Sequence, residues 1–172
     1  MSELPGNLEP HKEPVPPLAH SLTGLFETHL NVASLARSIA FYGTTLGLEL
    51  GIVIPERGLA IYWVGTRGKA MLGLWEKPPA QIQLQHFAFE VELADLTGTI
   101  QELQSKGIEV MDFFRRPTDE PNVFGWMPAA SVYFSDPDGH LLEILAMLPD
   151  QPRPEIGVVT LVEWRKFVAE GA

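Results

Sequence analysis

Two histidines and one glutamate stand out in this sequence because each lies in a run of β-forming residues. His29, His86 and Glu143 are evenly spaced, since the same number of residues separates the first pair and the second. A carboxylate in an apolar run is costly to bury unless it is paired or binds a metal. Two histidines and one carboxylate on separate strands form a metal site that keeps open positions. The sequence therefore predicts that these three residues hold one divalent ion.

The glutamate follows a strong turn signal. Asp136-Pro137-Asp138-Gly139 separates two apolar runs within residues 131–148. Proline presets its φ angle, aspartate bonds nearby backbone, and glycine accepts a positive φ. The segment is therefore predicted to be a strand, a tight turn and a second strand that carries Glu143. His140, inside the turn, is expected to be structural or solvated.

The remaining pattern indicates an internal repeat of strand, helix and three strands. In the first half we expect strands over 25–32, 48–54, 59–64 and 70–75, with a helix starting after Ser34. In the second half we expect a strand over 83–91, a helix starting at Asp95 or Thr97, and a strand over 108–113. A long loop, 115–129, then leads into the hairpin. This loop either lines the substrate pocket or is a variable surface loop.

Composition limits the possible classes of protein. The chain has 172 residues, of which 45% are hydrophobic, and this favours one globular domain. A net charge of −10 argues against nucleic-acid or anionic-membrane partners, which need a basic face. Cysteine is absent, so a metal would need histidine or oxygen ligands. No apolar run reaches transmembrane length and the N-terminus does not read as a signal peptide, so we expect a cytoplasmic protein.

The two ends of the chain lie outside the repeat. Residues 1–22 are rich in proline and are expected to form an extended or disordered arm. Residues 150–172 are expected to be a linker followed by a helix over 160–170, since Thr160 and Glu163 have the spacing of a capping box.

Taken together, residues 24–148 resemble the vicinal oxygen chelate superfamily, which includes glyoxalases, extradiol dioxygenases and bleomycin-resistance proteins. The resemblance rests on His29, Phe41-Tyr42 with Leu46-Gly47-Leu48, His86, and 136–140 followed by Glu143. It implies an α+β fold with two βαβββ modules, 23–80 and 81–149, forming a curled mixed sheet. The glyoxalase-like domain would span 23–149, with the C-terminal helix outside it.

The resemblance also implies where the ligands lie. Family members take them from the first and last strand of each module, and His29, His86 and Glu143 match three of these four places. The repeat places the fourth near Gly73, which has no ligating side chain. Glu76 would point to the opposite face unless the strand bulges, so a fourth ligand there is left open. Fosfomycin-resistance enzymes and extradiol dioxygenases use three protein ligands.

The expected function is a metal-dependent enzyme whose small substrate chelates the ion through two adjacent oxygens. It would be a glyoxalase-like lyase or a dioxygenase that uses Fe, Mn, Zn or Ni as a Lewis acid. Tyr133 and Asn31 are candidate catalytic residues, and no site for an organic cofactor is predicted. The alternative is a drug- or metabolite-binding protein without turnover, as in the bleomycin-resistance branch. A homodimer is expected, because family members commonly pair modules across a dimer.

Overall fold

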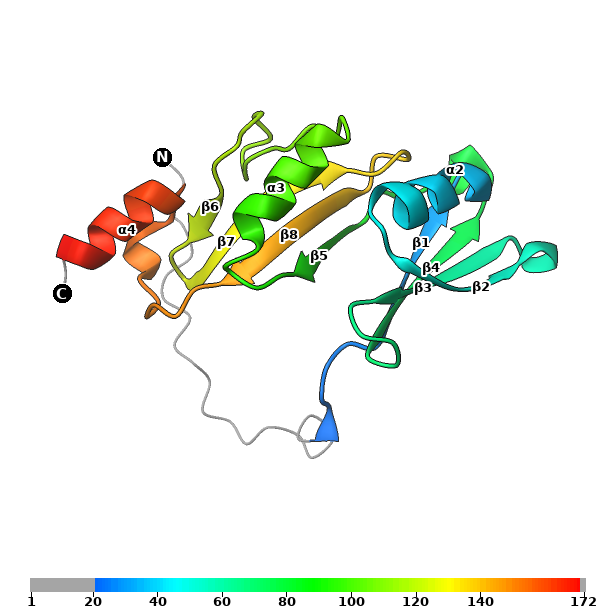
Figure 1. The fold of residues 1–172 in the computed structure, drawn as a ribbon, viewed down its shortest axis with the longest axis horizontal. Helices are drawn as coiled ribbons and strands as arrows, with labels where there is room; N and C mark the ends of the chain where they lie inside the picture. The colour runs from blue at the N-terminus through cyan, green and yellow to red at the C-terminus, as the bar shows by residue number, and fades with distance from the viewer. Residues whose placement is uncertain (1–20, 171–172) are drawn as a thin grey trace.

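The computed structural model of the chain describes residues 21–170 and contains two mixed sheets side by side (Figure 1). The first sheet has the strand order β1-β4-β3-β2. Its strands are β1 (Glu27–Val32), β2 (Glu49–Ile54), β3 (Leu59–Val64) and β4 (Ala70–Glu76). β1 and β4 are parallel, whereas the other two pairings are antiparallel. This is the βαβββ arrangement predicted for the first half.

A helical segment covers one face of the first sheet. Helix α2 (Leu35–Ile39) begins at Ser34, whose side chain accepts a bond from the Arg37 amide at 3.4 Å. It continues as a π-helical stretch, η1 (Ala40–Thr45), and the chain turns at Gly47, whose φ is 78°. Residues of even number along β1, such as Leu30 and Val32, are buried on this side. The residues between them, including His29, lie on the opposite face.

The second sheet has the order β5-β8-β7-β6-β9. Its strands are β5 (His86–Glu90), β6 (Asn122–Phe124), β7 (Met127–Ser135), β8 (Leu141–Met147) and β9 (Val158–Thr160). Helix α3 (Leu96–Ser105) covers one face (Figure 1), burying Leu96, Ile100 and Leu103. Single 3₁₀ turns, η2 (Pro55–Arg57), η3 (Pro79–Gln81) and η4 (Pro154–Ile156), complete the connections. The predicted α+β class with paired modules is confirmed.

Two of the segments predicted for the second module, the strand over 108–113 and the loop over 115–129, were wrong in their boundaries. Residues 108–113 do not form a strand, because Asp112 turns the chain by accepting bonds from Arg116, and only Met111 bridges to a neighbour. The second strand of this module is instead β6, inside the segment predicted to be a loop, and β7 begins before that segment ends. The loop is consequently shorter than expected and its aromatic residues belong partly to the sheet.

The C-terminal segment takes part in the second sheet. β9 pairs antiparallel with β6, and helix α4 (Leu161–Glu170) follows, close to the predicted range. Thr160 and Glu163 form the expected capping box, with the Thr160 amide donating to Glu163 Oε2 at 2.9 Å. Trp164 is fully buried and its Nε1 donates to Asp150 at 2.8 Å. The predicted arm over 1–22 lies almost wholly outside the described residues.

The turn between β7 and β8 joins the two modules. Tyr42 donates to Asp136 Oδ2 at 2.9 Å, and Arg37 pairs with Asp138. His140 is fully buried, with Nε2 donating to the Asn31 carbonyl at 2.9 Å and Nδ1 accepting from the Gln85 amide at 3.1 Å. These bonds hold this turn of the second module against the first module. Among residues 21–170, no helix is both long and apolar enough to cross a membrane.

Candidate metal centre

His86, Glu143 and Tyr133 come together on three neighbouring strands of the second sheet. Glu143 of β8 lies opposite Tyr133 of β7, and β5 brings His86 alongside. His86 Nε2 is 3.2 Å from Glu143 Oε2, and the Tyr133 hydroxyl donates to Glu143 Oε1 at 3.2 Å. Glu143 is 5% exposed, so its carboxylate is held by these two partners rather than by solvent. The prediction that Glu143 has a partner is confirmed.

The hydrogen bonds of His86 determine which ring nitrogen carries the proton. Its Nδ1 is 3.0 Å from the Leu141 carbonyl oxygen, which can only accept, so Nδ1 must donate. In the neutral ring, Nε2 then carries a lone pair and faces a carboxylate oxygen at 3.2 Å. Two electron-rich atoms at this distance need a proton or a metal ion between them. The donor set on this side fits a divalent cation, because a carbonyl bond to the second nitrogen is usual for metal-binding histidines.

Tyr133 remains a hydrogen-bond donor at physiological pH. Burial raises the pKa of its phenol well above the usual value, and the charge of Glu143 raises it further. The ring of Tyr133 lies 5.9 Å from that of His86, centroid to centroid. Tyr133, predicted as a catalytic residue, is therefore placed beside the two candidate ligands with its proton retained.

His29 lies on the corresponding strand of the first sheet, but its ring nitrogens are differently engaged. The Trp75 indole, which can only donate, bonds His29 Nδ1 at 2.8 Å. The proton of neutral His29 therefore sits on Nε2, which bonds the Glu27 carboxylate. In this conformation neither nitrogen offers a free lone pair to a metal. His29 would have to give up the bond to Trp75 before Nε2 could act as a ligand.

Gly73 allows the ring of His29 to lie against the sheet. The two residues are opposite one another in the β1–β4 pairing. A Cβ atom at position 73 would lie 2.1 Å from His29 Nδ1, which no real contact permits. Glycine at this point is thus required by the close approach of the histidine ring.

Strand register shows that Trp75, not Gly73, is the counterpart of Glu143. Glu143 pairs with the residue two beyond His86, and Trp75 pairs with Asn31, the residue two beyond His29. The prediction placed the fourth ligand position near Gly73, whereas the strand register places it two residues later, at Trp75. An indole occupies that place and no carboxylate does.

Glu76 lies on the other face of β4. Its Oε1 accepts the Leu35 amide at 3.0 Å, at the start of α2. Acidic groups are favourable at the first turn of a helix. Glu76 therefore caps a helix in this structure and does not face His29.

The described residues contain no set of three or more histidine and acidic side chains close enough to share one ion. The chain brings His86 and Glu143 together, whereas His29 stays with Trp75 and Glu27. Asn31, the other predicted catalytic residue, is on the same face of β1 as His29 and is half-buried. The candidate site is thus divided into two parts, one on each sheet.

Aromatic side chains extend the second part of the site. The ring of Phe113 lies 6.4 Å from Tyr133 and 5.3 Å from Phe124, and 45% of Phe113 is exposed. Its backbone amide donates to Asn122 at 2.8 Å, which fixes the segment. Phe113 was not predicted as a site residue because it was assigned to a strand. The sequence signal that could have identified Phe113 is its place in an aromatic pair just before Arg115 and Arg116.

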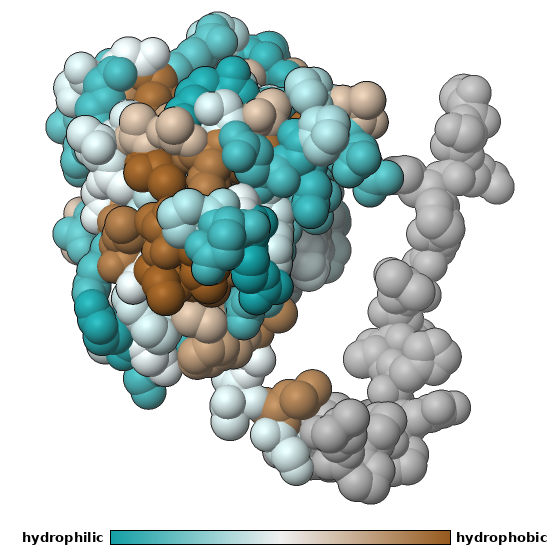
Figure 2. Space-filling model, turned by 90° about the vertical axis from the view of Figure 1, so that its right-hand side faces the viewer, coloured by the Kyte–Doolittle hydropathy of each residue, from teal (hydrophilic) through white to brown (hydrophobic). Residues whose placement is uncertain are grey.

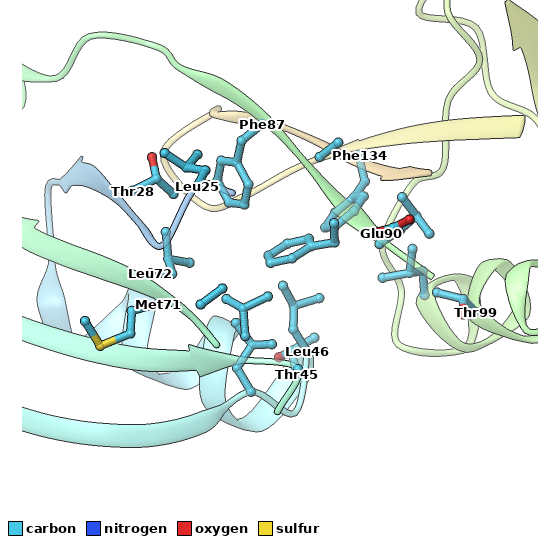
Figure 3. A pocket seen from close by; sticks show the side chains of 18 of the residues that line it. Leu25, Thr28, Thr45, Leu46, Met71, Leu72, Phe87, Glu90, Thr99 and Phe134 are labelled. Atoms are coloured by element: carbon cyan, nitrogen blue, oxygen red, sulfur yellow. The ribbon is translucent and has the colours of Figure 1, made fainter. Parts of the chain in front are cut away.

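A cavity of about 580 Å³ lies between the modules on the side facing the helices (Figure 3). Phe87, Phe134, Leu46 and Leu72 line it, with Glu90 and Thr99 at its edge. Because alternate residues of a strand face opposite ways, Phe87 points here while His86 points to the other face. The cavity is apolar and separate from the candidate ligands.

Comparison with known proteins agrees with this fold. Residues 23–144 match the model of the Glyoxalase/Bleomycin resistance protein/Dioxygenase superfamily. An integron cassette protein from the mobile metagenome of the Halifax Harbour sewage outfall is 36% identical, with a TM-score of 0.64 over 73% of this chain and 100% of that one. Oxidase ChaP-H2 is 23% identical, with a TM-score of 0.59 over 76% of this chain and 98% of its own.

A lactoylglutathione lyase from Agrobacterium tumefaciens has the same fold. It is 23% identical, with a TM-score of 0.55 over 73% of this chain and 94% of the lyase. Oxidase ChaP-H2 and this lyase are each 23% identical to the chain, and identities this low show a shared fold alone. The family match and the repeated modules together show that the chain belongs to the glyoxalase/bleomycin resistance protein/dioxygenase superfamily.

Proposed function

We propose that this protein is a metal-dependent enzyme in which His29, His86 and Glu143 hold one divalent ion. The observation that carries the proposal is the buried Glu143 carboxylate, whose Oε2 lies 3.2 Å from Nε2 of His86. A bound ion would supply Lewis-acid chemistry to a substrate that offers two adjacent oxygens. Superfamily neighbours are named as a lyase and as oxidases, and either reaction class suits this ligand set.

The residues beside the ligands suit control of a proton on a bound oxygen. Tyr133 keeps its hydroxyl proton and holds Glu143 Oε1, so it can orient the carboxylate and donate to an anionic oxygen nearby. Phe113 and Phe124 add apolar surface beside Tyr133. Asn31, on the His29 strand, would contribute a polar contact from the first sheet.

A homodimer would complete the site that one chain leaves divided. Each copy offers His86 and Glu143 on one sheet and His29 on the other. If two copies pair first sheet to second sheet, His29 of one copy meets His86 and Glu143 of the other, and a two-fold axis forms two equal sites. We therefore propose that the functional unit is a dimer whose metal ligands come from both copies.

The outer surface of the first sheet is suited to such pairing. Figure 2 shows a brown apolar area on this end of the molecule, beside polar regions. Ile52 of β2 is in register with Ile61, Gly73 and His29, so it lies on the His29 face, and it is 50% exposed. On the second sheet, Trp126 is 64% and Met147 is 47% exposed. Exposed apolar surface on both sheets is typical of surfaces that become buried in an assembly.

The direct test is the metal content of protein purified without chelator. We expect about one divalent ion per chain, lost in His29→Ala, His86→Ala and Glu143→Ala. His140→Ala, which alters a structural histidine, controls for histidine loss alone and should keep its metal if it folds. The identity of the metal then directs the assays, with iron leading to oxygen consumption and zinc, nickel or manganese to lyase and isomerase assays. A protein that takes up no ion from a panel of divalent metals would instead fit the ligand-binding alternative.

A mixing experiment separates a shared site from a site within one chain. His29→Ala and Glu143→Ala proteins are unfolded together and refolded in equal amounts. If the ligands come from both copies, mixed dimers contain one intact site, and about a quarter of the wild-type metal content returns. If each site lies within one chain, the mixture binds no more metal than the separate variants.

A further inference from the structure

We infer that Arg57 and Lys77, held over the ring of Trp75, form a binding subsite for an anionic group of the substrate. The inference rests on the proposed function, because it places this subsite beside His29. It concerns the chemical class of substrate that the site accepts. The substrate would carry a carboxylate, or another anionic group, in addition to the two oxygens that chelate the metal.

The two cations approach one aromatic ring. The guanidinium carbon of Arg57 lies 4.9 Å from the centre of the Trp75 ring, and Lys77 Nζ lies 5.5 Å from it. Contacts of a cation with an indole face at this distance are favourable. Arg57 comes from the turn η2 and Lys77 from the end of β4, so two segments bring their charges to one place.

The position of the cations is defined by the backbone. The Lys77 amide donates to the Val32 carbonyl at 2.9 Å, and the Gly58 carbonyl accepts the Glu76 amide at 2.7 Å. Gly58 has a φ of 60° and a Cβ there would lie 3.2 Å from that of Glu76. The turn that carries Arg57 is therefore tied closely to the end of β4. Trp75, whose ring both cations approach, donates its indole proton to His29.

Neither cation is neutralised by the residues that the structure describes. Within residues 21–170, no carboxylate forms an ion pair with Arg57 or Lys77. The acidic neighbours are used elsewhere: Glu76 accepts the Leu35 amide on the other face, and Glu27 bonds His29.

Arg67 provides an internal comparison. It also lies over a tryptophan, with its guanidinium carbon 5.9 Å from the centre of the Trp63 ring, but it is paired with Glu49. Arg67 therefore has a carboxylate partner, whereas Arg57 and Lys77 do not. An anion from outside the chain would supply the missing charge, and a guanidinium binds carboxylates in a planar, paired geometry.

Two chelators that differ in one charge test the inference. Butanohydroxamic acid offers two adjacent oxygens and no further charge, whereas succinic monohydroxamic acid adds a carboxylate. We expect metal-loaded wild-type protein to bind the carboxylated probe about tenfold more tightly. Arg57→Gln and Lys77→Gln should each lose most of this preference without changing the affinity for butanohydroxamic acid. Arg67→Gln should behave as the wild type. Equal affinities of wild type for both probes, or a preference that survives both substitutions, would overturn the inference.

A second measurement does not depend on the metal. Iodide and acrylamide quench exposed tryptophans, but only iodide is an anion. The difference in quenching between wild type and Trp75→Phe isolates Trp75 from the other tryptophans. We expect iodide to quench Trp75 more efficiently than acrylamide does, and this excess to fall in Arg57→Gln and Lys77→Gln. If the protein binds no metal, the proposed function fails while this result still decides whether the subsite attracts anions.

Discussion

Trp75 and Glu143 occupy equivalent positions in the two modules, each paired with the residue two beyond the module's histidine. The carboxylate of Glu143 faces His86, whereas the indole of Trp75 donates to His29. The two histidines consequently have opposite tautomers, with the proton on Nδ1 in His86 and on Nε2 in His29. The second module thus presents His86 and Glu143 as a pair of candidate ligands. In the first module, His29 is hydrogen-bonded to Trp75 instead.

Replacing Trp75 by phenylalanine should strengthen metal binding. The change removes the indole proton that occupies His29 Nδ1, so the ring can place its proton there and offer Nε2 to an ion. Without this hydrogen bond the metal-free state is about 1 kcal/mol less stable. This corresponds to about a fivefold gain in metal affinity. Competition with a chelating dye measures this affinity. Trp63→Phe, in the same sheet, is the control, and unchanged affinity in Trp75→Phe would show that the bond does not compete with the metal.

Much of this arrangement could be predicted from sequence, because it follows from local patterns. Runs of β-forming residues placed His29 and His86 on separate strands, and the Asp136–Gly139 signal located the hairpin that carries Glu143. Trp75 was missed because its role depends on strand register, which pairs residues distant in sequence. The strand expected over 108–113 failed because Asp112 bonds Arg116, a turn contact that hydrophobic periodicity does not register.

Glu143→Gln and Tyr133→Phe should have different effects on metal binding. Glutamine keeps the shape of Glu143 and can still accept from Tyr133, but it removes the negative ligand. Loss of a partner that only orients a ligand costs about 10 to 100-fold in metal affinity, and loss of the ligand itself should cost at least as much. We therefore expect a loss of about 100-fold or more for Glu143→Gln and about tenfold for Tyr133→Phe. Isothermal titration with the native metal gives both values, and a larger effect of Tyr133→Phe would contradict the assigned roles.

Gly73→Ala should displace His29 without unfolding the protein. The new methyl group would lie 2.1 Å from the present position of Nδ1, so the ring must rotate away from Trp75. We expect loss of the Trp75 bond and a change in metal affinity, measured by titration, with the circular dichroism spectrum kept. Gly98→Ala is a matched control, because nothing lies within 4 Å of a Cβ there and α3 should gain about 0.5–1 kcal/mol. Identical metal affinities in wild type and Gly73→Ala would show that His29 is not a ligand.

The bond from Tyr42 to Asp136 should make stability depend on pH in the alkaline range. Tyr42 is fully buried, and its hydroxyl donates at 2.9 Å to the turn of the other module. Burial first, and then the charge of Asp136, raise the pKa of this phenol above its ordinary value of 10.0. The unfolded chain therefore loses this proton at a lower pH than the folded one does. The contribution of Tyr42 is complete below pH 10.0 and declines as the pH rises above that value.

Tyr42→Phe removes this contribution and tests its size. At neutral pH we expect the variant to lose about 1–3 kcal/mol of unfolding free energy, because Asp136 Oδ2 loses its buried donor. The difference between wild type and variant should shrink as the pH rises above about 10, where the unfolded wild type becomes a phenolate. Urea unfolding at several pH values measures both effects. Ile100→Val, a buried substitution that removes no titrating group, separates this result from general alkaline instability, since its effect on stability should not change with pH. A difference that stays constant with pH would mean that Tyr42 does not link proton release to unfolding.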